Sequence, residues 1–509
     1  MTKNTYTYRI RVAGESTGVQ AEIRDPQENV RGEPSGNFRY QDYQERIEAL
    51  AGKAFAGKAD KYVLVKREIR ELGEALFNAL FDPELRTSFL TWYDRVVHGE
   101  NGGLLRVELD VDERRSARLA ALPWEFLCVP QNQITGSLWL ATAPRLIFSR
   151  RRALWNPAAP IQLEPGEKLR IAMAVAAPQD LGVVKFEKLW QELEELAQQN
   201  AQLELLPLVN PATREAIDAT LEQKPHIFHF LGHGRLLETD GRQQGEIAIL
   251  RPPNIARWVD AQQFGSLFNR HRPGIVVLQA CEGAAGSTSQ AFVSVASQIV
   301  RQNVPVVLAM QYEISNATAR AFSREFYRRL SQGKPVDEAA QEGRNEIADF
   351  HESRDFATPV LFMRVRRGQI FLKPEEEQDA GIPVENGDET SGEGEQVVVE
   401  SDEPVLSRVR KVLLDCGEFH DNAAVVQILA TTPSLRLWRH SVPGAVDAGG
   451  RVDAVMAFLL DKFRADTNEN GLVLFLQSLS AKKEEGDRCK GALARLAEEL
   501  SREVKPPQW

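Results

Sequence analysis

The chain has 509 residues, enough for two or three domains with a large buried core. Hydrophobic residues make up 43% of it and charged residues 26%, as in an ordinary globular protein. The net charge of −10 is misleading, because residues 374–407 hold twelve acidic residues and no Lys or Arg. The rest of the chain is close to neutral, which argues against a nucleic-acid-binding protein, and the absence of 18 consecutive apolar residues argues against a membrane span.

The cysteines and the N-terminus point to the cytoplasm. Residues 1–6 contain no apolar stretch typical of a signal peptide. The four cysteines are far apart and share no Cys-x-x-Cys spacing, so we expect reduced thiols rather than a disulfide framework. These are Cys128, Cys281, Cys416 and Cys489.

Residues 1–165 are predicted to be α+β. Apolar residues alternate with polar ones over 6–12 and 105–111, as in half-buried strands. Between them, apolar residues at helical spacing predict a helix over 69–80. The segment 122–127, Leu-Pro-Trp-Glu-Phe-Leu, is a compact apolar unit that we expect to serve in packing.

From residue 166 to 373 strands alternate with helices. Buried strands are expected over 169–176, 203–209, 227–231, 275–280, 304–310 and 360–365. Helices are expected over 186–196, 213–221, 292–300, 316–331 and 336–349. This alternation predicts an α/β fold with a mainly parallel sheet and helices on both faces.

The last part of the chain changes character twice. Residues 374–404 are acidic, rich in Gly, Pro and Ser, and too poor in apolar residues to fold alone, so we predict a disordered linker. Residues 405–509 carry apolar residues at helical spacing and are predicted to form a small all-helical bundle.

Two of the predicted strands end at a reactive side chain followed by small residues. One runs into His233 and Gly234, and the other into Cys281. Because the carboxyl ends of parallel strands meet at one sheet edge, we expect an imidazole beside a thiol, as nucleophilic cysteine catalysis requires. The backbone N–H groups of Gly234 and Cys281 are candidates for an oxyanion hole.

His229 lies four residues before His233. On a strand these two residues share a face, but no carboxylate or cysteine cluster completes a metal site. We therefore interpret His229 as a structural histidine and expect no metal.

The motifs resemble the CHAT family of caspase-like cysteine peptidases, relatives of separase and the caspases, over about residues 100–372. The resemblance rests on Leu122–Leu127, His233-Gly234, Gln279-Ala280-Cys281-Glu282, Val304–Met310 and Ala321–Tyr327. It implies a caspase-like sheet with His233 and Cys281 as a catalytic dyad and no metal or organic cofactor. Caspases carry Gln-Ala-Cys-(Arg/Gln/Gly)-Gly at the nucleophile, and Glu282 departs from that pattern.

A second departure concerns specificity. The family commonly has Trp-x-Val-(Ser/Thr)-Asp after the strand over 304–310, whereas this chain has Tyr-Glu-Ile-Ser-Asn at 312–316. In separase-like relatives an acidic residue at the position of Glu313 pairs with a basic P1 side chain. The resemblance thus implies an S1 role for Glu313, and the alternative is a solvated carboxylate at a strand end.

The helical tail resembles the effector-associated, death-like adaptor domains of bacterial defence effectors, through residues 413–416, 471–479 and 486–496. It implies that residues 405–509 bind a partner protein with a matching domain; the alternative is a stabilising appendage. Together these features predict an endopeptidase that cleaves protein substrates after a basic residue, in bacterial antiviral defence or regulated cell death. Two rivals remain, a catalytically silent scaffold and a nucleotide-binding α/β module, although neither a Gly-x-Gly-x-x-Gly turn nor a phosphate loop is present.

Overall fold

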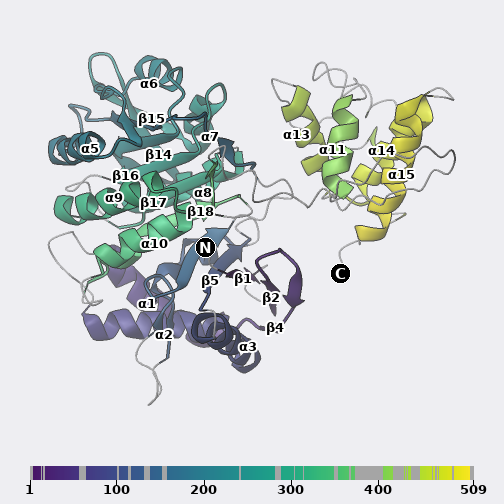
Figure 1. Cartoon of the computed structure of the whole chain (residues 1–509), viewed down its shortest axis with the longest axis horizontal. Coiled ribbons are helices and arrows are strands. Elements are labelled where there is room, and N and C mark those ends of the chain that lie inside the picture. The colour runs from purple at the N-terminus through teal and green to yellow at the C-terminus, as the bar shows by residue number, and fades with distance from the viewer. Residues whose placement is uncertain are drawn as a thin grey trace, which may run out of the picture. The chain divides into compact units, whose positions relative to one another are not determined.

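The computed structural model divides into two compact units, Met1–Val384 and Glu385–Trp509 (Figure 1). Cys281, Glu313 and the acidic segment 374–404 lie outside the described residues, and the boundaries at residues 165 and 404 stay predictions. The described residues are 4–12, 14, 18–56, 65–99, 102–112, 116–130, 138–151, 158–239, 242–280, 288–302, 304–312, 315–348, 353–365, 368–372, 405–415, 429, 432, 434–436, 448–460, 462–464, 467, 469–483 and 487–504.

The first unit is built on one mixed sheet, with twelve strands in the described part of the chain. They are β1 (Thr5–Val12), β2 (Gly18–Arg24), β3 (Val30–Gly32), β4 (Ser35–Asn37), β5 (Leu104–Val111), β8 (Leu146–Arg151), β10 (Leu169–Val175), β11 (Leu203–Leu205), β12 (Ile227–Gly232), β16 (Ile275–Ala280), β17 (Val306–Met310) and β18 (Pro359–Met363). Their order is β11-β10-β12-β16-β17-β18-β8-β5-β1-β2-β3, with β4 beside β2. The α/β fold class is therefore confirmed.

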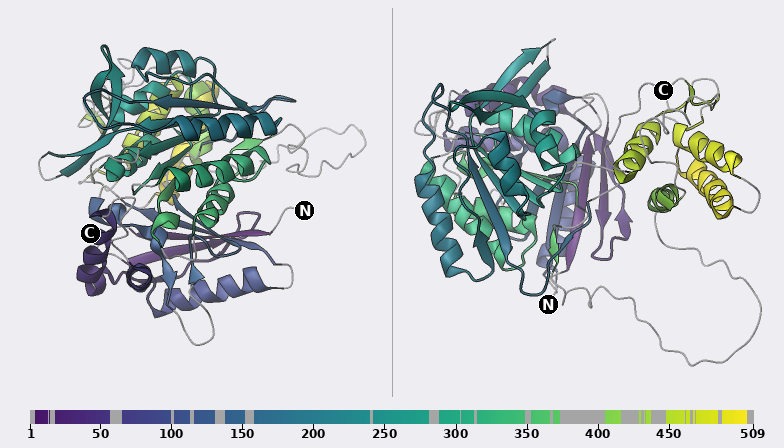
Figure 2. Two further views of the ribbon diagram at one scale, coloured as in Figure 1. Left: turned by 90° about the vertical axis from the view of Figure 1, so that its left-hand side faces the viewer. Right: turned by 90° about the horizontal axis from the view of Figure 1, so that it is seen from above.

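The neighbours from β11 to β17 are all parallel, and both faces of this half are covered (Figure 2). On β10, Met173 lies in one apolar cluster and Ala172 in another, because successive side chains point to opposite faces. The first cluster includes residues of α5 (Glu187–Gln199), α9 (Asn316–Ser331) and α10 (Val336–Glu346). The second includes residues of α6 (Arg214–Leu221), α7 (Ala261–Gly265) and α8 (Thr288–Gln302).

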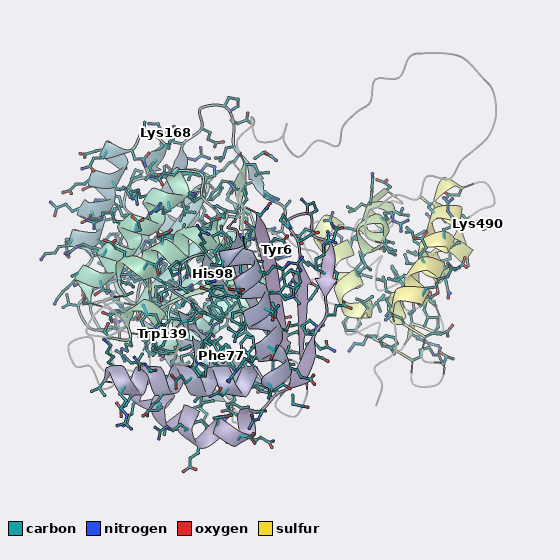
Figure 3. All side chains as sticks on the ribbon, turned by 60° about the horizontal axis from the view of Figure 1, so that its bottom comes forward. Tyr6, Phe77, His98, Trp139, Lys168 and Lys490 are labelled. Carbon is teal, nitrogen blue, oxygen red and sulfur yellow. The ribbon has the colours of Figure 1, made fainter. Side chains whose placement is uncertain are left out.

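The other half of the sheet packs on helices from the N-terminal part of the chain. These are α1 (Tyr40–Ala56), α2 (Lys66–Leu80), α3 (Pro83–Tyr93) and the short α4 (Ala117–Ala121). Asp82 caps α3 by accepting a hydrogen bond from the Leu85 N–H. Pro83 suits the first helical position because a backbone N–H there has no partner within the helix, and proline has no N–H. Phe77 and Trp139, labelled in Figure 3, both belong to the apolar core of this half.

Strand β5 corrects one expectation. Its alternating pattern predicts a half-buried strand, but all eight residues of β5 are buried. The polar face carries ion pairs in place of water contacts: Arg106 pairs with Asp337, and Glu108 pairs with Arg9 and Arg151. A buried charge needs such a partner, and sequence periodicity does not reveal whether one is present.

Several small elements were not expected. His233 leads directly into an antiparallel sheet of β13 (Gly234–Thr239), β14 (Arg242–Arg251) and β15 (Ile255–Asp260). The described part of the first unit also contains two strand pairs, β6 (Cys128–Val129) with β7 (Leu138–Trp139) and β9 (Ile161–Gln162) with β19 (Phe371–Leu372).

The second unit is helical, as predicted. Its described helices are α11 (Val405–Asp415), α13 (Ala448–Leu460), α14 (Gly471–Lys482) and α15 (Arg488–Glu503). Cys128 is a free thiol, whereas Cys489 at the start of α15 is disulfide-bonded. The expectation of reduced thiols is therefore wrong for Cys489, because distance along the chain does not set distance in the fold. Of the helices described, none is long and apolar enough to cross a bilayer.

Candidate active site

The two strands expected to carry the reactive residues are neighbours. β12 pairs in parallel with β16, and their last paired residues are Gly232 and Ala280. His233 and Cys281 are the next residues in the sequence after these two. The strands therefore reach the same sheet edge at the same level. Cys281 itself lies outside the described residues, so the geometry below is that of its neighbours.

A backbone carbonyl fixes the orientation of the His233 ring. The residue is 5% exposed, and its Nε2 lies 2.8 Å from the carbonyl oxygen of Gly182. Because a carbonyl only accepts hydrogen bonds, Nε2 carries the proton, and Nδ1 of the neutral ring is the nitrogen able to accept one. The ring is thus held in the protonation state of a general base.

The surroundings of His233 keep its ring neutral. Burial lowers the pKa of His233, while the hydrogen bond to Gly182 and the charge of Asp180 partly oppose that shift. Burial wins because the charged imidazolium loses more hydration than these two groups restore. A histidine with a lowered pKa is available to take a proton near neutral pH.

Gly182 is a site residue that sequence reasoning missed. It lies in the loop between β10 and α5, and this loop is held at two earlier points. The Gln179 N–H donates to the Asn254 carbonyl at 2.9 Å, and Asp180 Oδ1 accepts from the Ala256 N–H at 2.8 Å. No sequence signal marks Gly182, because every residue type supplies a backbone carbonyl.

The start of β13 bears on the proposed oxyanion hole. The Ala248 N–H donates to the His233 carbonyl at 2.9 Å, and Gly234 is opposite Ile247 in the same antiparallel ladder. Hydrogen-bonded and non-hydrogen-bonded pairs alternate along such a ladder. The Gly234 N–H therefore points away from β14, which leaves it oriented for another acceptor.

His229 is a buried histidine with partners at both ring nitrogens, as expected for a structural residue. Its Nε2 lies 3.1 Å from Gln279 Oε1, and its Nδ1 lies 2.9 Å from the Tyr327 hydroxyl. Since the amide oxygen accepts, Nε2 donates, and the Tyr327 hydroxyl donates to Nδ1. Burial lowers the pKa of His229 to about 4, so the ring is neutral. This relay ties α9 to β12 and to the residue two positions before Cys281.

Glu313, the candidate S1 residue, also lies outside the described residues. The structure describes Gln311 and Tyr312 before it, both of them buried. Within the described ranges, no group of three or more His, Cys, Asp or Glu residues could hold a metal ion.

This mainly parallel sheet, with helices on both faces and His233 directly after strand β12, defines an α/β protein. Residues 70–377 match the CHAT domain, so the chain belongs to that family of caspase-like cysteine peptidases. Residues 399–503 match bacterial death-like domain 1, which identifies the helical second unit.

Comparisons with individual proteins add little. No curated protein matches the chain. Among solved structures, it is similar to the separase–securin complex of Saccharomyces cerevisiae, with 10% identity, a TM-score of 0.40, and coverage of 71% of this chain and 30% of that one. It is also similar to the Arg-specific cysteine proteinase gingipain R (RgpB), with 9% identity, a TM-score of 0.33, and coverage of 65% and 76%. A complex of the Porphyromonas gingivalis RgpB pro- and mature domains gives 11% identity and a TM-score of 0.32, with coverage of 65% and 78%.

Proposed function

We propose that the protein is a cysteine endopeptidase whose nucleophile is Cys281 and whose general base is His233. The observation that carries this proposal is the register of β12 and β16, whose last pair stands one residue before both side chains. Support also comes from the His233 ring, which is neutral and held through Nε2 by the Gly182 carbonyl.

The proposed chemistry uses the groups at this sheet edge. The Cys281 sulfur attacks a peptide carbonyl carbon while His233 Nδ1 takes the thiol proton. The N–H groups of Gly234 and Cys281 stabilise the oxyanion of the tetrahedral intermediate. That intermediate collapses to an acyl-enzyme as His233 returns the proton to the leaving amine. Water then hydrolyses the thioester, with His233 again acting as the base.

The proposed P1 preference is for Arg or Lys through Glu313, because a carboxylate selects a basic side chain by charge and hydrogen bonding. No Lys or Arg lies between Lys373 and Arg408, so the acidic segment offers no bond for self-cleavage. A panel of fluorogenic peptides differing only at P1 tests this preference. Preference for Asp or an apolar residue would overturn the assignment of Glu313.

The experiment that tests the peptidase is proteome-wide identification of new N-termini, comparing wild type with Cys281→Ala. Cleavages present only with the wild type are expected, with a shared residue before the cut. Cys128→Ala is a matched control, because its buried thiol has a pKa raised to about 12 and cannot serve as a nucleophile. Equal cleavage patterns for wild type and Cys281→Ala would favour the silent scaffold, and equilibrium binding of labelled nucleotides would test the nucleotide-binding alternative.

The death-like domain supports a role in recruitment. Helical adaptor domains of this class suggest homotypic binding, so residues 405–509 would bring the peptidase to a partner protein with a matching domain, in bacterial antiviral defence or regulated cell death. A tether raises the local concentration of one module near the partner of the other. Survival of phage-challenged bacteria expressing wild type, Cys281→Ala or a chain lacking residues 399–509 tests this role. Equal survival with all three would contradict it.

A further inference from the structure

Glu125 lies at the centre of the apolar segment 122–127, and it is completely buried. Its carboxylate is held by Arg150 of β8 in a two-point ion pair, with Arg150 Nε 2.9 Å from Oε1 and Nη2 2.5 Å from Oε2. The same guanidinium donates to the carbonyls of Ala120 and Leu122, at 2.9 and 3.0 Å. The pair is therefore well satisfied, as a buried ion pair must be in order to persist.

The carboxylate has one further partner, in a different part of the chain. Gln311 Nε2 donates to Glu125 Oε2 at 3.1 Å and also to the carbonyl of Ala357. The Gln311 backbone N–H donates to the Thr358 carbonyl at 2.8 Å. Gln311, which is 2% exposed, is thus fixed both through its side chain and through its backbone.

Tyr312, the next residue, is held by an aromatic contact and a cation–π contact. Its ring centroid lies 6.0 Å from that of Phe126, the residue after Glu125. The Arg354 guanidinium carbon lies 4.9 Å from the Tyr312 ring centroid, a cation–π contact. The segment 122–127 therefore contacts both residues that follow β17.

The position of Gln311 in the sheet relates its contact with Glu125 to the proposed active site. β17 is the parallel neighbour of β16, and Leu278 is paired with Ala309. Two positions further along the two strands are Ala280 and Gln311, so Gln311 stands level with the residue before Cys281. Gln311 is also two residues before Glu313 in the sequence.

We propose that Gln311, held by the Glu125–Arg150 ion pair, is a positioning residue that sets P1 recognition at the carboxyl end of β17. The inference rests on the proposed peptidase function and deepens it. Substrate-contacting groups need supports whose own geometry is locked, and a buried bidentate ion pair supplies such a lock.

The test compares two substitutions of the same kind. Gln311→Met removes the side-chain hydrogen bonds and keeps the ion pair and a similar volume. Gln341→Met is the matched control, because Gln341 is also a buried glutamine, and its amide bonds to the Leu140 carbonyl and the Phe148 N–H instead. The full chain is assayed with fluorogenic peptides that differ only at P1.

For Gln311→Met we expect KM for the best P1 residue to rise about tenfold and the discrimination between P1 residues to decrease, while kcat changes little. Gln341→Met should stay within about twofold of wild type. Alkylation of Cys281 by iodoacetamide should proceed at the wild-type rate in both, because that reagent needs no P1 contact. Equal KM and P1 preference in the two variants, or a loss confined to kcat, would overturn the proposal.

A second measurement does not depend on activity. Hydrogen exchange of the backbone N–H groups at positions 311 and 312 should be faster in Gln311→Met than in wild type and unchanged in Gln341→Met. Unchanged exchange in Gln311→Met would overturn the positioning role even in an active enzyme. If wild type shows no cleavage that depends on Cys281, the peptidase proposal fails. Faster exchange at these two positions would then still show that the Gln311 side chain holds this segment in place, but the P1 role would be lost.

Discussion

At the scale of single residues, the proton on His233 is held on one nitrogen by the Gly182 carbonyl, and this decides how activity should respond to acid. Protonation of Nδ1 removes the proposed general base, so kcat/KM for peptide cleavage should fall on the acid side. Burial lowers the pKa of His233, so that fall is centred below pH 6.5, the ordinary value for histidine.

Asp180 offers a direct test of this electrostatic balance. Its charge raises the pKa of His233, so Asp180→Asn should move the acid limb of kcat/KM to lower pH. The asparagine keeps an oxygen to accept the hydrogen bond from the Ala256 N–H, which preserves the loop. The measurement is the pH profile of peptide cleavage at constant ionic strength. A limb that stays in place, or moves to higher pH, would contradict the role of Asp180.

The buried relay at His229 predicts a cost in stability. Tyr327→Phe removes the hydroxyl that donates to Nδ1 and leaves a buried acceptor without its partner. We expect a loss of about 1–3 kcal/mol in the free energy of unfolding, measured by urea denaturation. Tyr43→Phe is the control, since that ring is only half-buried on α1 and lies under the Arg39 guanidinium. Equal losses in the two variants would count against the relay.

At the scale of elements, the sequence predicted the strands that matter most for the site. β12 and β16 are mostly apolar, interrupted only by His229 and by Gln279, and such near-continuous runs mark parallel strands buried on both faces. The sheet of β13, β14 and β15 was not predicted, because its strands mix Arg, Glu and Gln with apolar residues and only Ile247–Leu250 forms a longer apolar run.

The candidate site was predictable only where a side chain carries the chemistry. His233 is a recognisable residue type at a strand end, whereas Gly182 acts through its backbone and Glu125 through a partner distant in sequence. Segment 122–127 was expected to serve only in packing, and its apolar neighbours gave no sign that Glu125 would be ion-paired. The catalytic roles of His233 and Cys281, the oxyanion role of Gly234 and the S1 role of Glu313 all stay predictions.

The contact between α2 and segment 122–127 gives a prediction about two glycines. A Cβ at Gly73 would lie 2.3 Å from the Phe126 carbonyl oxygen and 2.8 Å from Cys128 Cβ, so Gly73→Ala must push α2 away from this segment. We expect a loss of about 1–3 kcal/mol in unfolding free energy. Gly52→Ala is the matched control on α1, where a Cβ meets nothing within 4 Å, and it should gain roughly 0.5–1 kcal/mol. Urea denaturation measures both, and a tolerated Gly73→Ala would contradict the close packing.

At the scale of the whole molecule, the chemistry and the partner binding are proposed for different units. The first holds every group proposed for chemistry, and the second matches a domain class that works by binding. The two units are compact separately, so substitutions in the peptidase core should leave partner binding intact. Binding of Cys281→Ala to a candidate partner is therefore expected to equal that of wild type.

The buried histidines make the first unit sensitive to acid. Burial lowers the pKa of both His226 and His229 to about 4, whereas an unfolded histidine titrates near 6.5. The unfolded chain therefore binds more protons below pH 6.5, and stability should fall as pH drops from about 6.5 to about 4. For the fully buried His229 the full loss is roughly 3 kcal/mol. Urea denaturation at several pH values within this window measures the slope.

His229→Gln separates this titration from other effects of acid. Glutamine keeps a donor and an acceptor for Gln279 and Tyr327 but does not titrate, so the slope should shrink, while His226 and His233, whose pKa values are also lowered, supply the remainder. His98→Gln makes the same substitution at an exposed position and controls for the replacement of a histidine by glutamine. Between pH 7.5 and pH 5 the His229→Gln variant should therefore lose less stability than wild type. Parallel curves for His229→Gln and wild type would mean that His229 is already protonated, or not buried, in the folded protein.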